Sequence, residues 1–192
     1  MARPPTSMPA DVAMPFTVGI VIGAGAAQQL IRRIGVRVTT VGGLVVATIG
    51  LLLYARITND GTYLGQLFPA VMVTSIGLGL TFVPVTLLAT TNVPAEDAGL
   101  ASGLFNTSQQ IGGALGLAIL STLAATRTGH KLDALGHKAS FSERASALIS
   151  GYHLAFIVGA GLMAIAVVLL ATLIRRSDVE QIQAEEPVLL AA

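Results

Sequence analysis

Five long apolar stretches limit what this chain can fold into. They cover approximately residues 14–31, 38–55, 64–90, 99–123 and 152–174. Each is close to the about 20 apolar residues that a helix needs to cross the hydrocarbon core of a bilayer. The backbone finds no water in that core, so a segment that crosses it must form a helix or part of a closed barrel. We therefore predict an all-α, polytopic bundle of five transmembrane helices in contact with the lipid bilayer.

The composition supports a membrane protein and excludes several other classes. Hydrophobic residues make up 53% of the chain, charged residues only 11%, and the mean hydropathy is +0.76. The net charge of +1 and the short basic runs provide no cationic surface for nucleic acid. The chain has no cysteine and three scattered histidines, and it lacks a phosphate-binding glycine loop or a nucleophile with a base partner. We therefore predict no enzyme, no catalytic residues, no metal site and no cofactor.

Basic residues between the spans predict the orientation of the chain. Arg32, Arg33 and Arg37 lie in the short connection after the first span, and two further arginines follow the last span. Because cytoplasmic loops carry an excess of Lys and Arg, we place both connections in the cytoplasm. The segment 1–13 then lies outside the cell and the tail 177–192 inside, in a multi-pass protein of the cell membrane.

The connection predicted over residues 124–151 conflicts with this orientation. It would be an external loop, yet it contains Arg127, Lys131, Lys138 and Arg144. Its leucines recur irregularly among polar residues, so it is interpreted either as an ordered loop or as a loop with a short helix at the membrane surface.

The fourth span carries polar residues at its centre. At 100° per residue, Ser102, Asn106, Gln109 and Gln110 fall within about a third of the helix circumference. An unpaired amide at this depth costs several kcal/mol, so this stripe must face another helix or water. Cavity lining is one interpretation, and interhelical hydrogen bonding is the other. The glycine pairs of this span favour close helix packing, which can occupy an adjacent face; they are Gly99 with Gly103 and Gly112 with Gly116.

Other polar or helix-breaking residues have more ordinary interpretations. Pro84 removes a backbone donor from the third span and predicts a bend there. Glu96 and Asp97 precede the fourth span, where carboxylates stabilise the positive end of a helix. No Asp, Glu or Lys lies in the middle of any span, so a proton relay within the membrane is not predicted for this chain alone.

Two stretches together resemble a known transporter family. In "QQLIRRIGVR", residues 28–37, a match to the loop pattern G-x-L-A-D-R-x-G-R-R is made by Leu30, Arg33, Gly35 and Arg37. The stretch "VPAEDAGLASGLFNTSQQIGGALGLAIL", residues 93–120, is similar to the run V-P-x-E-x-A-G-x-A-S-G-x-x-N-x-x-R/Q-Q-x-G-G-A-x-G. The chain thereby resembles the major facilitator superfamily, and within it the fourteen-helix drug:proton antiporters of the EmrB/QacA type.

The resemblance implies a function and a missing partner. The five spans look like the last five helices of an exporter, with Asn106 and Gln109 lining an alternating-access cavity. The proton-binding carboxylates would belong to an N-terminal half that is missing here, and the substrates would be small lipophilic or cationic molecules such as antibiotics. The alternative is a non-transporting membrane module, either a truncated product or a subunit that assembles with a separate N-terminal half.

Overall fold

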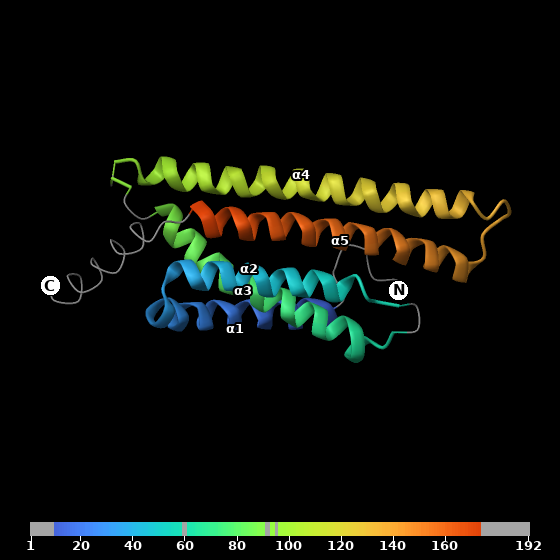
Figure 1. The fold of residues 1–192 in the computed structure, drawn as a ribbon, viewed down its shortest axis with the longest axis horizontal. Helices are drawn as coiled ribbons and strands as arrows, with labels where there is room; N and C mark the ends of the chain where they lie inside the picture. Colours follow the sequence, from blue (N-terminus) through green and yellow to red (C-terminus); the bar gives the residue numbers. More distant parts are fainter. Residues whose placement is uncertain (1–9, 59–60, 91–92, 95, 174–192) are drawn as a thin grey trace, which may run out of the picture.

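The described part of the chain is helical. The computed structural model describes residues 10–58, 61–90, 93–94 and 96–173, which form long helices joined by short connections (Figure 1). The elements are α1 (Ala10–Ile34), α2 (Val36–Tyr54), the π-helical turn η1 (Tyr63–Leu67), α3 (Phe68–Thr90), α4 (Ala98–Asp133) and α5 (Phe141–Leu173). Five helical segments are long and apolar enough to cross a membrane. The predicted all-α bundle of five candidate spans is confirmed, whereas the predicted tail 177–192 and most of the segment 1–13 lie outside the described residues.

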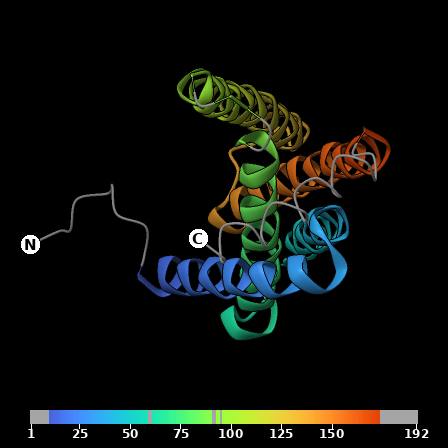
Figure 2. The same cartoon turned by 90° about the vertical axis from the view of Figure 1, so that its left-hand side faces the viewer.

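Helix α3 lies between α1 and α2, and its contact with α1 depends on small side chains (Figure 2). A Cβ atom added to Gly23 would lie 3.0 Å from the Cα of Gly79, and one added to Gly79 would lie 3.0 Å from the Cα of Gly23. One turn away, Gly19 packs against the side chain of Ser75. Lipid tails are as apolar as the side chains, so membrane helices associate mainly through such close contacts.

The opposite side of α3 packs against α2 in the same way. A Cβ atom at Gly77 would lie 2.7 Å from the Cα of Ala47, and one at Gly50 would lie 2.7 Å from the Cα of Thr74. Gly77 and Gly79 are two residues apart and therefore about 200° apart around the helix. Alternating small residues thus let α3 approach two helices closely at once.

Helices α4 and α5 form a separate pair at the edge of the bundle. They pack closely at Gly151, where an added Cβ would lie 3.2 Å from the carbonyl carbon of Ala124. The hydroxyl of Thr128 donates to the same Ala124 carbonyl at 2.8 Å. Helix α5 also packs against α2, whereas α4 contacts little besides α5. No residue is buried in the most apolar 18-residue segment of α4. One long helix is therefore left largely uncovered.

Polar contacts tie α5 to α2 near both ends. The Arg37 guanidinium donates to the carbonyl oxygen of Ala171 in the last turn of α5. About 27 Å away along α5, at 1.5 Å per residue, the Nε2 of His153 donates to the Ile57 carbonyl at 2.6 Å. These contacts define two levels that are separated by nearly the thickness of a hydrocarbon core.

Most of the connection predicted over residues 124–151 is helical and not a loop. Helix α4 continues to Asp133 and α5 begins at Phe141, so only residues 134–140 form the turn. Gly136 reverses the chain there with a φ of 66°, a left-handed conformation that favours glycine. The 36 residues of α4 extend about 54 Å, beyond the 40–45 Å or so of a whole bilayer. Hydropathy identifies only the apolar part of a helix. Residues of high helix propensity, such as Ala, Leu and Lys, extend α4 beyond that part.

Candidate functional site

A pocket lies where α1, α3 and α4 approach one another. Its volume is about 530 Å³, within the range of small-molecule sites. Its lining residues are Ile20 from α1, Leu78, Thr81, Phe82 and Val85 from α3, and Gln109 from α4. The pocket therefore lies between the edge of the unit formed by α1, α2 and α3 and the otherwise uncovered α4.

The pocket is apolar with two polar groups and no ionisable side chain in its lining. The Thr81 hydroxyl donates to the carbonyl oxygen of Gly77 at 2.8 Å, so towards a ligand it acts as an acceptor. The amide of Gln109 both donates and accepts. Phe82 leaves 58% of its surface exposed and can present a ring face to a flat or cationic ligand. This combination suits an amphipathic small molecule.

The structure places the predicted polar stripe of α4 on a largely uncovered face. Gln109 lines the pocket, whereas Ser102, Asn106 and Gln110 do not. Ser102 is half-buried, while Asn106, Gln109 and Gln110 are exposed. None of these side chains forms a hydrogen bond to another described residue, so interhelical bonding within the described chain does not account for the stripe.

The sequence interpretation missed the α3 side of the pocket. Leu78, Thr81, Phe82 and Val85 share one face of α3, at the i, i+3, i+4, i+7 spacing of a helical stripe. The other faces of α3 carry the glycines that pack on α1 and α2. The spacing was visible in the sequence, but only the packing shows which stripe remains open.

The predicted packing glycines of α4 contact no neighbouring helix here. An added Cβ would meet nothing within 4 Å at Gly99, Gly103, Gly112 or Gly116. The predicted close packing at these glycines is therefore not formed within the described part of this chain. A packing role against helices outside it stays a prediction. The glycines that do form close contacts are on α1, α2, α3 and α5, as described above.

The proline and the acidic pair lie where the sequence placed them. Pro84 is fully buried inside α3, and the helix continues to Thr90. It cannot donate to the carbonyl one turn earlier, so a bend at this position stays a prediction. Asp97 occupies the position before the first turn of α4, although its side chain makes no capping hydrogen bond.

The arginine-rich connection between α1 and α2 is a turn of one residue. Gly35 alone separates the two helices and has a φ of 83°. Of the other residues that match the loop pattern, Leu30 is half-buried and Arg33 is exposed. Arg37 reaches the last turn of α5, where its charge stabilises the negative end of the helix. The structure thus brings this turn and the end of α5 to the same end of the bundle (Figure 1).

Comparison with known proteins identifies relatives along most of the chain. The puromycin resistance protein pur8 of Streptomyces alboniger is 32% identical over 164 residues, which cover 84% of this chain and 32% of that protein. The cephamycin export protein CmcT of Amycolatopsis lactamdurans is 37% identical over 58% of this chain and 23% of its own length. The tetracenomycin C resistance and export protein of Streptomyces glaucescens is 33% identical over 60% of this chain and 21% of its own length.

These relatives are much longer than this chain, which spans about a third of their length or less. A family model described as Major Facilitator Superfamily matches residues 6–117, more than half of the chain. That region includes the arginine-rich turn, α1, α3 and the first part of α4 with its polar stripe. The five-helix membrane bundle and this match together show that the chain belongs to the Major Facilitator Superfamily of membrane transporters.

Proposed function

We propose that this chain is the C-terminal portion of a proton-driven multidrug exporter and that α1, α3 and α4 form one wall of its substrate cavity. The observation that carries the proposal is the pocket of about 530 Å³ in which Gln109, from the polar stripe, meets the apolar face of α3. The named relatives of similar sequence are antibiotic resistance and export proteins. In superfamily transporters the substrate site lies near the membrane midplane between two repeated halves.

The lining indicates the class of substrate. Four apolar side chains, one hydroxyl acceptor and one amide fit small lipophilic molecules with few polar groups. The exposed ring of Phe82 also permits binding of a lipophilic cation through its π face.

Proton coupling and alternating access would depend on chain segments outside this sequence. No Asp, Glu or Lys lies in the middle of a candidate span, so the proton-binding group would come from the N-terminal half. We place the α1–α2 turn and the C-terminus in the cytoplasm and the N-terminus outside, because of the exposed Arg32 and Arg33.

A second candidate is a subunit that exports nothing alone and assembles with a separate N-terminal half. The exposure of α4 favours it, because three polar side chains of the stripe are exposed in the described chain. Both candidates require a second half, so expression with and without that half tests them together.

The test is drug accumulation in a sensitive bacterial strain. The chain is expressed alone and together with the part of the puromycin resistance protein that precedes the region of similarity, and puromycin accumulation is measured with and without a protonophore. We expect export only in the co-expressing cells, and we expect the protonophore to abolish it. Export by the chain alone, or export that the protonophore leaves unchanged, would contradict the proposal.

Two substitutions on α4 then test the cavity assignment. We expect Gln109→Ala to change drug selectivity or reduce export several-fold, because it removes the amide of the pocket. The matched control is Ser121→Ala, which is exposed on the same helix about 18 Å away and does not line the pocket. Equal export by both variants across several drugs would refute the assignment.

A further inference from the structure

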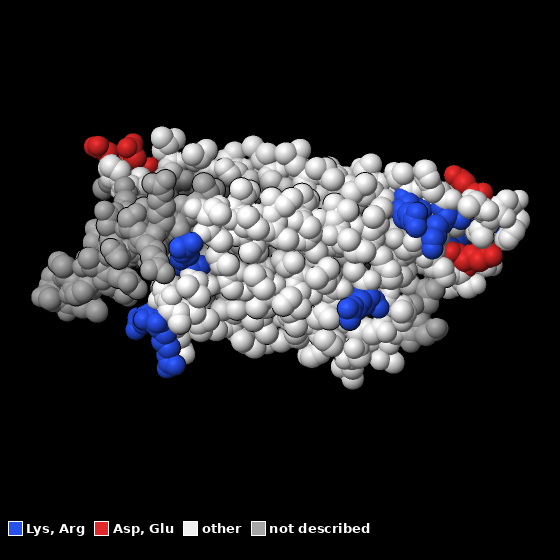
Figure 3. Space-filling view, viewed as in Figure 1, with Lys and Arg blue, Asp and Glu red and all other residues white. Residues whose placement is uncertain are grey.

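Unpaired positive charge gathers where α4 and α5 join. Arg127 and Lys131 lie at the end of α4, Lys138 in the turn and Arg144 at the start of α5, and all four are exposed. We call these four residues the hairpin cations. Figure 3 shows Lys and Arg atoms over this end, with Asp and Glu atoms beside them, whereas the visible middle of the described bundle is nearly free of charge. Within the described residues, none of the hairpin cations forms an ion pair.

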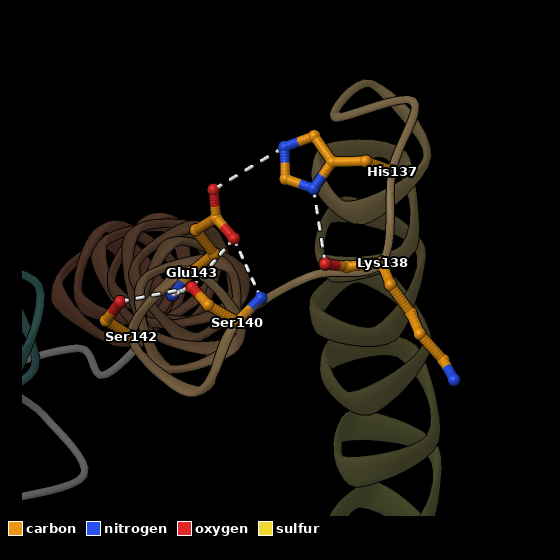
Figure 4. Close-up of polar contacts among 5 residues, drawn as sticks. All are labelled: His137, Lys138, Ser140, Ser142 and Glu143. Atoms are coloured by element: carbon orange, nitrogen blue, oxygen red, sulfur yellow. Dashed lines mark hydrogen bonds and ion pairs between the residues drawn. The ribbon is translucent and has the colours of Figure 1, made fainter.

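Two carboxylates lie in the same hairpin, and neither pairs with a hairpin cation. Asp133, the last residue of α4, is exposed and forms no ion pair with another described residue. Glu143 accepts hydrogen bonds from the backbone N–H of Ser140 at 2.8 Å and from its hydroxyl at 2.7 Å. Its other oxygen lies 3.8 Å from Nε2 of His137 (Figure 4). This is a capping arrangement at the start of α5, so Glu143 is engaged by Ser140 and His137 and not by the four cations.

The contacts between helices locate this end relative to the membrane. His153 bonds to Ile57 just beyond the end of α2, about 27 Å along α5 from the Arg37 contact. Tyr54 and Tyr152 line one pocket at this level, and tyrosine is enriched at membrane interfaces. The hydrocarbon boundary therefore passes close to His153 and to the neighbouring contact of Gly151 with Ala124.

Three of the hairpin cations lie just beyond that boundary. Arg127 is three residues past Ala124, about 4.5 Å along the helix axis. Lys131 is seven residues past Ala124 and Arg144 seven residues before Gly151, about 10 Å each. The headgroup layer occupies roughly 5–8 Å on each face of the bilayer, and long cationic side chains reach back towards it. All three charges can therefore meet lipid phosphates.

A groove at the same place supplies further contacts for a headgroup. Its volume is about 270 Å³, and its lining residues are Lys131, Leu135, Ser142, Glu143, Ser146 and Ala147. The ammonium group and the Ser142 hydroxyl suit a phosphate and its glycerol. The Glu143 carboxylate also lines the groove but is held by Ser140.

We propose that Arg127, Lys131 and Arg144 bind the headgroups of anionic phospholipids on the membrane face opposite the α1–α2 turn. This explains why a connection so rich in Lys and Arg lies at the end of the bundle opposite the other arginine cluster. A surface cation favours an anionic lipid roughly fivefold, so we expect enrichment of roughly fivefold at each of the three cations.

The test uses energy transfer from a label near the hairpin to labelled lipids. The chain has no cysteine, so Thr126→Cys, at an exposed position, carries a single donor dye. The full chain is placed in nanodiscs of phosphatidylcholine that contain the same small fraction of acyl-labelled phosphatidylglycerol or acyl-labelled phosphatidylcholine. We expect stronger transfer to phosphatidylglycerol, and we expect the combined change Arg127→Gln, Lys131→Gln and Arg144→Gln to abolish the difference.

Two further arms make the result specific. Arg32→Gln with Arg33→Gln removes cations at the opposite end and should leave the transfer near Thr126→Cys unchanged. Added inorganic phosphate should leave it unchanged as well. Equal transfer to both lipids, a lipid preference that survives in the triple variant, or displacement by free phosphate would each overturn the proposal. Circular dichroism of each variant verifies that its helices are intact.

Discussion

The close approach of α1 and α3 predicts that Gly79→Ala destabilises the fold. The new methyl group would lie 2.9 Å from the backbone nitrogen of Ala24 and 3.0 Å from the Cα of Gly23, whereas carbon atoms pack best at about 3.5–4.0 Å. Backbone atoms cannot rotate away, so the helices must separate. Overpacking costs about 1–3 kcal/mol, and replacing glycine in a helix recovers about 1 kcal/mol. Taking the upper cost, we expect a net loss of about 2 kcal/mol.

The matched control is Gly116→Ala on α4, where nothing lies within 4 Å of the added Cβ. It should gain up to about 1 kcal/mol from helix propensity, so the two variants should differ by about 3 kcal/mol. Helices often persist in sodium dodecyl sulfate, so unfolding is measured by energy transfer between dyes on Ile22→Cys and Phe68→Cys, both at exposed positions. The detergent midpoint should fall for Gly79→Ala and stay the same or rise for Gly116→Ala. A midpoint that rises equally in both variants would refute the assignment of Gly79 as a contact.

The same unfolding assay tests three contacts at the ends of the helices. Gly35→Ala forces a side chain into the left-handed region and should cost about 1–2 kcal/mol; an unchanged midpoint would show that the turn adapts without strain. Arg37→Gln removes a charge from the end of α5 and should cost about 0.3–1 kcal/mol, whereas the exposed Arg32→Gln should cost less, and equal effects would contradict the capping contact. His153→Phe removes a hydrogen bond to a carbonyl and should cost about 0.5–1.5 kcal/mol, with Tyr152→Phe as the control on the neighbouring, more exposed residue.

The candidate site shows where sequence reasoning ended. The polar residues of α4 stood out in the sequence because amides are rare at membrane depth, and Gln109 does line the pocket. Leu78, Phe82 and Val85 supply most of the opposite side. As apolar residues in an apolar span, they could not be distinguished from its other faces until the packing of α3 showed which face remained open.

The connection between α4 and α5 shows a second limit. Hydropathy reports where an apolar run ends, and the apolar run of the fourth span ends near residue 123. It could not report that the helix continues to Asp133, because helix propensity acts in water as well as in lipid.

The sequence alone determined that this chain is a five-helix membrane bundle, because hydropathy and helix length are properties of each segment by itself. It also identified the family pattern over residues 93–120, which requires no knowledge of neighbouring segments. Only the tertiary structure decided which glycines are contacts: those of α4 are open, whereas Gly23 meets Gly79 across α1 and α3. A pair of small residues shows that a helix can be approached closely, but a contact also requires a partner that brings its own small residues to the same level.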